Sequence, residues 1–194
     1  MSRKTSQPPH RERYAPYRAE EKVAQRIMVP RNDLKRIYML SDMPESMLAR
    51  LADIAHLYIY SANMSLFESG ENLKHFYMVL TGQVSLSIDL VTDVSITLGT
   101  VGQGHACGVS AFIPESRSSS KAVCDEPSEL IVLSADEVFA LFEEDWDLAY
   151  QFTSRIVRLF KAIMDHRTSI FIKSLKNNPQ VQKSLRQTEL AQII

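Results

Sequence analysis

The stretch from Phe67 to Leu133 contains all six glycines of the 194-residue chain, and their positions constrain its fold most strongly. Apolar and polar residues alternate on both sides of Gly82, which is typical of a half-buried antiparallel pair of strands. The glycines fall at the breaks between strand-like runs, where a positive φ or a close backbone approach favours glycine. The stretch therefore predicts a turn-rich β-domain, with a β-to-helix corner at Cys107-Gly108-Val109.

Helical patterns flank the strands. The run from Ser46 to Ile54 predicts a helix that the Ser46 side chain caps. Ser134 and Glu137 have the spacing of a capping box at the start of a helix that runs to about residue 142. We also expect a short helix over residues 18–28, ended by the proline that follows, and a hairpin tip over residues 89–93.

A longer helix is predicted from about Trp146. Apolar positions recur along it at alternating spacings of four and three residues, which is the a/d seam of a coiled coil. The seam consists of Phe152, Ile156, Leu159, Ile163, His166 and Ile170. We interpret it as the interface of a parallel homodimer, because it extends past the length that a β-domain can cover. The alternative is a helix that docks on the β-domain of its own chain.

The residues of the central stretch also occur in the order of a known family. The matching segments are Leu66 to Glu71, Phe76 to Val84, Leu98 to Gly104, Cys107-Gly108 and Glu129 to Leu133. In this order they resemble the cyclic nucleotide-binding β-roll of the Crp/Fnr superfamily of bacterial regulators. The resemblance implies a fold that is mainly β with flanking helices, in which a double-stranded, jelly-roll-like β-roll precedes a long dimerisation helix.

The resemblance divides the chain into four parts. Residues 1–35 form an N-terminal tail with the short helix, and residues 36–144 form the cyclic nucleotide-binding-like β-roll. Residues 145–176 form the dimerisation helix. Residues 177–194 form the start of a truncated winged helix-turn-helix domain.

The C-terminal part begins at a helix-breaking Asn177-Asn178-Pro179. The residues that match the first helix of the family's helix-turn-helix are Gln187, Glu189, Leu190 and Ala191. The match stops before a recognition helix, so we expect the 194-residue chain to lack sequence-specific DNA binding. Contact with DNA would come only through a C-terminal domain missing from this chain. The alternative for this part is an ordinary amphipathic helix.

The resemblance also implies a ligand site against the corner at Gly108. In the family, backbone N–H groups after the corner face a cyclic phosphate, an arginine neutralises it, and a glutamate accepts from the ribose hydroxyl. Here Arg117 takes the role of the arginine. The implied effector-binding residues are Gly108, Val109, Ser110, Arg117, Ser118, Ser119, Ile163 and Met164.

Two positions depart from the family's pattern. Val109 stands where the ribose glutamate is expected, and valine cannot accept a hydrogen bond. Ile163-Met164 stand where cyclic AMP receptors have a threonine-serine pair. We therefore expect cyclic AMP to bind weakly or not at all, and the effector stays unidentified. The alternative is an effector whose acidic group meets Arg117 and whose body meets apolar residues, namely Val109, Phe112, Ile113, Ile163 and Met164.

His105 and Cys107 raise the question of a metal or haem. An iron–sulfur cluster needs about four cysteines, and this chain has two, Cys107 and Cys124. We interpret His105 and Cys107 as structural, expect no metal site and disfavour haem. His166 is interpreted as a polar position on the helix seam, with a pH-sensitive pair across a dimer axis as the alternative. The sequence has no nucleophile elbow, P-loop or paired metal-ligand spacing, so we expect no enzyme.

Composition limits the classes of partner. The net charge of −1 implies no general attraction to polyanions. Two cysteines form no disulfide framework, and no apolar stretch approaches the about 20 residues of a membrane helix. We therefore expect a cytoplasmic homodimer without membrane contact, in which a small-molecule effector controls a transcription regulator. The other class is a stand-alone cyclic nucleotide-binding-like module with a degenerate site that acts in protein interaction.

Overall fold

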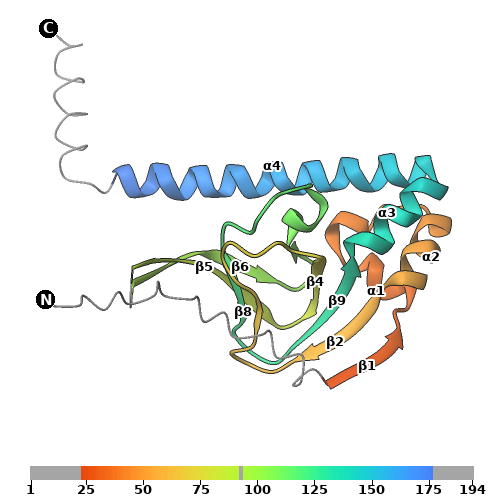
Figure 1. The fold of residues 1–194 in the computed structure, drawn as a ribbon, viewed down its shortest axis with the longest axis horizontal. Helices are drawn as coiled ribbons and strands as arrows, with labels where there is room; N and C mark the ends of the chain where they lie inside the picture. The colour runs from red at the N-terminus through yellow and green to blue at the C-terminus, as the bar shows by residue number, and fades with distance from the viewer. Residues whose placement is uncertain (1–22, 92–93, 177–194) are drawn as a thin grey trace, which may run out of the picture.

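The computed structural model describes residues 23–91 and 94–176, which form two antiparallel sheets and a set of helices (Figure 1). The first sheet has the order β1 (Val23–Met28), β2 (His56–Tyr60), β9 (Ser128–Ser134), β4 (His75–Thr81) and β7 (Ala106–Cys107). The second has the order β3 (Ser65–Phe67), β8 (Lys121–Cys124), β5 (Gln83–Val91) and β6 (Val94–Gly102). This arrangement confirms the predicted fold class, a β-roll with flanking helices.

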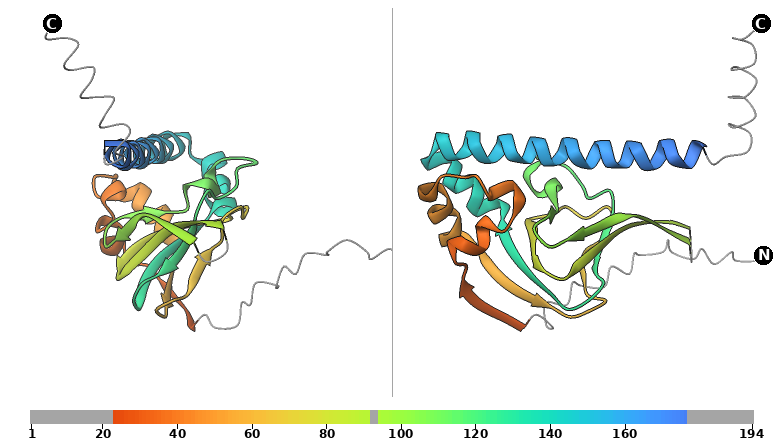
Figure 2. Two further views of the ribbon diagram at one scale, coloured as in Figure 1. Left: turned by 90° about the vertical axis from the view of Figure 1, so that its left-hand side faces the viewer. Right: turned by 180° about the vertical axis from the view of Figure 1, so that it is seen from behind.

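The helices lie on one side of the roll (Figure 2). They are α1 (Arg31–Lys35), η2 (Tyr38–Leu40), α2 (Glu45–Ile54), η3 (Val109–Phe112), α3 (Ala135–Glu144) and α4 (Trp146–Lys176). The shorter helices α1, α2 and α3 gather at one end of the roll, and α4 runs along its length (Figure 1). No helix in the described ranges is both long and apolar enough to cross a membrane.

The predicted helix over residues 18–28 is wrong where the structure describes it. Val23–Met28 is the strand β1, which pairs antiparallel with β2 through Val23 opposite Ile59 and Met28 opposite His56. The exposed edge of β2 supplies backbone hydrogen bonds that no local pattern reveals, and β-branched residues such as Val23 fit a strand. Residues 18–22 lie outside the described residues.

The predicted pairing across Gly82 is also wrong. β4 pairs with β7 and β9, whereas β5 pairs with β6 and β8 in the other sheet. Gly82 has φ 89°, and a Cβ atom there would lie 2.8 Å from the Cα of Ser128. Gly82 therefore marks the point where the chain crosses from one sheet to the other, at a backbone contact that only glycine permits.

Element boundaries differ slightly from the predictions. α2 begins at Glu45, with Pro44 at the N-cap position two residues before the predicted cap, so Ser46 is not its cap. α3 follows Ser134 as predicted, without a side-chain capping bond from Ser134, and it extends to Glu144. β5 continues to Val91 and β6 resumes at Val94, so the hairpin is longer than predicted and its tip, residues 92–93, lies outside the described residues.

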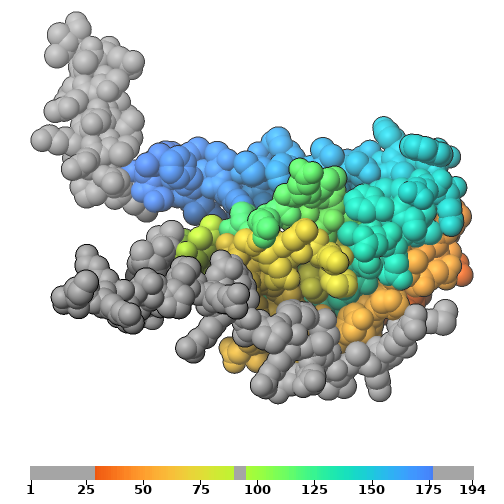
Figure 3. Space-filling model, viewed as in Figure 1, coloured from red at the N-terminus to blue at the C-terminus, as the bar shows by residue number. Residues whose placement is uncertain are grey.

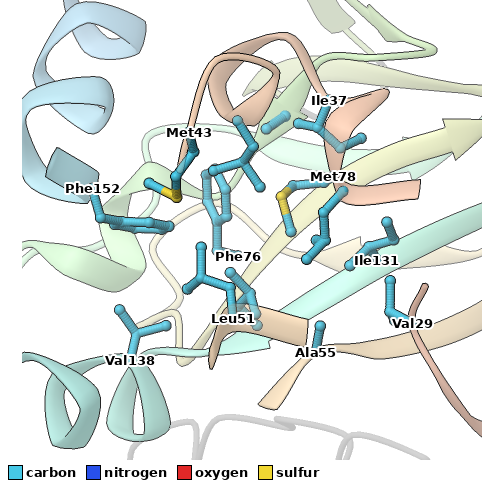
Figure 4. Packing of buried hydrophobic residues seen from close by; sticks show 14 of the residues in the cluster. Val29, Ile37, Met43, Leu51, Ala55, Phe76, Met78, Ile131, Val138 and Phe152 are labelled. Atoms are coloured by element: carbon cyan, nitrogen blue, oxygen red, sulfur yellow. The ribbon is translucent and has the colours of Figure 1, made fainter. Parts of the chain in front are cut away.

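Two apolar clusters hold the roll together, and β4 contributes to both. Phe76 and Met78 belong to the cluster between the first sheet and the helices, whereas Tyr77 and Val79 belong to the cluster between the two sheets. Because successive strand residues face opposite sides, a strand buried on both faces reads as a continuous apolar run. Figure 4 shows Phe152 of α4 reaching into the first cluster, beside the side chains of the sheet.

The first half of the predicted helix seam is part of this core. Phe152 is 1% exposed and Ile156 8% exposed, and Leu159 and Ile163 pack against the same cluster. Burial of a side chain the size of Phe152 stabilises the docked helix by about 1.5–3 kcal/mol. The alternative of docking on the helix's own β-domain therefore holds here, and these residues do not face outward to pair with a second helix.

A polar contact reinforces the docking of α4. The buried guanidinium of Arg155 donates from Nη2 to Oδ1 of Asp42 at 2.9 Å and from Nη1 to Oε1 of Gln151 at 2.7 Å. Arg155 holds the pKa of the Asp42 carboxyl below its usual range, first through this hydrogen bond and then through its charge. The bond ties α4 to the loop that follows η2.

Candidate functional site

The corner after β7 is built as the glycine pattern predicts. Gly108 adopts a left-handed conformation, φ 86° and ψ 25°, and the short helix η3 begins at Val109. A Cβ atom on Gly108 would lie 3.0 Å from the carbonyl oxygen of His75 in β4. The turn therefore needs glycine both for its φ and for the close approach to the neighbouring strand.

A cavity of about 120 Å³ lies against this corner, between the roll and α4. We call it the corner cavity. Seven of the eight residues predicted to bind the effector line it: Gly108, Val109, Ser110, Ser118, Ser119, Ile163 and Met164. Phe160 and Arg167, which are not among the predicted residues, also line it from α4. Their spacing from Ile163 and Met164 on one helix, three residues in either direction, was the signal that could have found them.

A second cavity of about 560 Å³ adjoins the first. We call it the hairpin cavity, because β6 residues 98–102 form one wall and α4 forms the other. Its volume is within the about 300–1,000 Å³ of small-molecule sites. The residues that line both cavities are Leu86, Val101, Ala106, Ile163 and Arg167. The two cavities together offer a small end at the corner, where serine hydroxyls and Arg167 lie among apolar side chains, and a larger, mostly apolar end beneath α4.

Arg117 does not line either cavity, contrary to its predicted role. The side chain is exposed, and its Nη1 donates to the carbonyl oxygen of Gly70 at 2.8 Å. Exposure alternates along the loop, so that the next residue, Ser118, is buried and its Oγ donates to the carbonyl oxygen of Ser120 at 2.6 Å. A backbone bond from Gly70 N to the carbonyl oxygen of Ser118 at 2.7 Å holds this register. The loop therefore directs Arg117 away from the site.

The charge at the corner cavity comes from α4 instead. Nη1 of Arg167 lies 3.2 Å from Oγ of Ser119. Within the described ranges, Arg167 is the one charged residue that lines the corner cavity.

A family model described as the cyclic nucleotide-binding domain matches residues 59–145, which include the corner at Gly108 and the loop of Ser118–Ser120. Residues 59–145 thus correspond to a cyclic nucleotide-binding domain. Residues 59–145 contain most of the strands and the corner at Gly108. The helix α4, which follows them in the chain, forms the other wall of the corner cavity.

Solved structures share the fold of this cyclic nucleotide-binding domain. A domain of that kind from Methylobacillus flagellatus KT is 20% identical with a TM-score of 0.66, over 74% of this chain and 80% of that one. The Thermus thermophilus catabolite activator protein is 19% identical with a TM-score of 0.58, over 71% of this chain and 63% of that one. The N-terminal domain of a Streptomyces coelicolor A3(2) transcriptional regulator is 16% identical with a TM-score of 0.59, over 69% and 93%.

A curated relative is cGMP-dependent protein kinase, isozyme 1, of Drosophila melanogaster. It is 26% identical over 115 residues, which are 58% of this chain and 15% of the kinase. The chain thus spans only a small part of that relative's length.

The apolar residues expected to meet the body of the effector do not all line the cavities. Phe112 packs in the core, with its ring centroid 5.2 Å from that of Phe76 and 5.4 Å from that of Phe152. Ile113 is exposed and lines neither cavity. The end of η3 therefore closes the domain's core, and only its beginning faces the site.

His105 and His166 both line the hairpin cavity, whereas Cys107 does not. His105 is exposed and lies edge-on to Tyr38, with ring centroids 4.8 Å apart. Cys107 is buried in the core between the sheets, and His166 lines the hairpin cavity. In the described part of the chain no three histidine, cysteine or acidic side chains come together as a metal-ion site.

Both thiols are predicted to be unreactive in the folded protein. Burial raises the pKa of the Cys107 thiol to about 12 and that of Cys124 to about 11, so the nucleophilic thiolate is scarce at neutral pH. In a titration with Ellman's reagent at pH 8, neither thiol should react until denaturant unfolds the chain, when both should react. Rapid reaction of either thiol in the native protein would contradict this environment.

Proposed function

We propose that the chain is the ligand-sensing and dimerisation part of a Crp/Fnr-type transcription regulator. The observation that carries the proposal is that α4 forms a wall of both cavities, so an occupant would contact the helix directly. In this proposal residues 36–144 bind the effector and residues 145–176 transmit its presence. The similarity to a Thermus thermophilus activator and to a Streptomyces coelicolor regulator supports this role over that of an enzyme.

We propose a homodimer whose interface is an exposed apolar stripe on α4, one residue out of phase with the seam predicted from sequence. The stripe consists of Tyr150, Val157, Phe160, Met164 and Phe171, which are 45–71% exposed. Four of them recur every seven residues, as the a positions of a coiled coil do. In Figure 3, α4 forms one edge of the molecule, and its outer flank is uncovered by other described segments.

The stripe and the corner cavity share two residues. Phe160 and Met164 are exposed members of the stripe, and both also line the cavity. A molecule in the cavity would therefore touch side chains that pack against the partner helix in a dimer. This arrangement supports coupling between effector binding and the geometry of the dimer.

DNA is proposed as the target of the signal, through a helix-turn-helix domain that follows α4. The predicted start of that domain, residues 177–194, lies outside the described residues. A complete dimer of this kind would bind a two-fold symmetric site with half-sites about 10 bp apart. Action in the cytoplasm belongs to the same proposal, because transcription regulators act where the bacterial chromosome lies.

The alternative function is a stand-alone binding module. The cGMP-dependent protein kinase relative favours it, because there a similar domain forms 15% of a protein of another class. The two functions differ in what an occupant of the cavity does. A sensor changes its dimer equilibrium when the effector binds, whereas a stand-alone module binds without that change.

The methyl group of Met164 is a reporter for this test. We expect a small-molecule effector to shift the Met164 methyl signal in carbon-13 NMR, because that side chain lines the corner cavity. The signal of Met47, on α2 and away from both cavities, should stay unchanged. A library of cyclic nucleotides and small organic acids is suitable, with sedimentation measured for each compound that binds. A compound that shifts Met164 without changing the dimer dissociation constant would favour the stand-alone module.

A further inference from the structure

Arg167 lies where the two cavities meet. It lines both of them, and it is half-buried on the side of α4 that faces the roll. The described residues provide no carboxylate in ion-pair contact with it, and its Nη1 donates to the neutral hydroxyl of Ser119 at 3.2 Å. Two other cations of α4, by contrast, are paired, Arg155 with Asp42 and Lys161 with Asp165. The positive charge of Arg167 is therefore available to an occupant.

The groups around Arg167 at the corner are suited to an anion. Hydroxyl groups of Ser110 and Ser119 line this end of the cavity, whereas the Ser118 hydroxyl donates to the carbonyl oxygen of Ser120. Hydroxyls and a guanidinium donate hydrogen bonds to phosphate or carboxylate oxygens, and arginine does so with paired bonds. No acidic side chain among the described residues lines either cavity, so nothing there competes for these donors.

The rest of the space is suited to an apolar body. Leu98 and Val101 from β6 face Leu159 and Ile163 from α4 across the hairpin cavity. A planar or aliphatic group of moderate size would gain burial there. An occupant with a charged end and an apolar body would therefore lie with its charge at Arg167 and its body between β6 and α4.

We propose that Arg167 of α4 is the anion-binding residue of this site, in the role that Arg117 does not fill, and that the effector carries a phosphate or carboxylate group on an apolar or planar body. This inference rests on the proposed sensing function. It also specifies the regulation, because the anion would link α4 to the loop of Ser118–Ser120. The effector's charge would thereby hold the helix against the roll.

The experiment uses inorganic phosphate, cyclic AMP and adenosine as probes, since adenosine has the base and ribose of cyclic AMP without the charge. Binding is followed by NMR through the Met164 methyl, the Ser119 amide and the Arg167 side-chain Nε–H. The variants are Arg167→Gln, Arg167→Lys and Arg117→Gln. Arg158→Gln is the matched control for loss of a helix charge, because Arg158 is exposed on α4 and lines neither the corner nor the hairpin cavity.

In the wild type, phosphate should shift Ser119 and Arg167, and cyclic AMP should bind about tenfold more tightly than adenosine. Arg167→Gln should abolish this advantage, Arg167→Lys should keep part of it, and Arg117→Gln and Arg158→Gln should keep all of it. Equal binding of the charged and neutral probes, or loss of the advantage in Arg117→Gln alone, would overturn the role of Arg167 and leave the sensing function standing. A protein in which no probe shifts Ser119 or Met164 would refute both.

Discussion

Lysine substitutions at Val157 and Phe171 are expected to convert a dimer of this chain into monomers. The two side chains are 60% and 62% exposed in the single chain, and they occupy equivalent positions two heptads apart on α4. A dimer through the stripe would bury them, and like charges brought together without partners at an apolar interface are strongly unfavourable. Sedimentation velocity over a concentration series should show dimers for the wild type and monomers for the double variant.

The helix docking should survive in this double variant. Neither Val157 nor Phe171 belongs to the apolar clusters or lines a cavity, so the thermal transition of the monomer should remain cooperative. Ser169→Lys is the matched control, because Ser169 is exposed on α4 but off the stripe, and its variant should stay dimeric. A wild-type chain that sediments as a monomer at every concentration would contradict the proposed interface.

Lysine at Leu159 and Ile163 would test the seam that the sequence alone suggested. Both residues pack against the core beneath α4, so a charge there should weaken the docking of the helix rather than separate two subunits. The two pairs of substitutions thus distinguish an interface between chains from one within a chain. The substituted residues of the two pairs lie close together on α4, since Val157 and Leu159 are only two positions apart.

The phase of α4 shows why its role was only partly predictable. Two apolar stripes run along the helix one residue apart, with Ile156, Ile163 and Ile170 on one and Val157, Met164 and Phe171 on the other. Both satisfy the spacing of a coiled-coil seam. Which stripe meets the roll depends on where the sheet and the shorter helices leave an apolar surface, and that surface is assembled from residues far away in the sequence.

The strands and the corner were more predictable, because their signals are local. Gly108 needs a left-handed conformation whatever the surroundings, and that requirement is visible in the sequence. The partner of each strand is not local, so the local pattern predicts a helix at β1 and a pairing of β4 with β5, and both predictions are wrong. At Gly82 the glycine itself was read correctly as a break, but its cause, the contact with Ser128, lies 46 residues away.

The candidate site shows the same limit at the level of single side chains. Seven of the residues predicted from the sequence around Gly108 and from α4 line one cavity in the structure. The predicted role of Arg117 is wrong because successive side chains of an extended loop point to opposite faces. Arg167 was missed because it reaches the site from a helix that begins more than thirty residues after Gly108. Its contact with Ser119 depends on how α4 docks.

Val109→Glu is expected to raise the affinity for cyclic AMP by about tenfold to a hundredfold, because a hydrogen bond to a charged acceptor contributes about 1.5–3 kcal/mol. Val109 lines the corner cavity as the first residue of η3, so a carboxylate there would meet a ribose hydroxyl held at the corner. The wild type, which lacks this acceptor, should bind cyclic AMP only weakly. Isothermal titration calorimetry measures both affinities, and sub-micromolar binding by the wild type would contradict the expectation.

The ligand itself provides the decisive control for this substitution. With 2′-deoxy cyclic AMP, which lacks the hydroxyl, Val109→Glu should bring no gain, and Val109→Gln should bring a smaller gain than Val109→Glu for cyclic AMP. Because Val109 is buried, the introduced carboxylate should lower the melting temperature of the free variant, and bound nucleotide should restore it. A folded variant whose affinity for cyclic AMP is unchanged would mean that the corner does not hold the ribose. An equal gain with the deoxy compound would mean that the carboxylate acts elsewhere than on the hydroxyl.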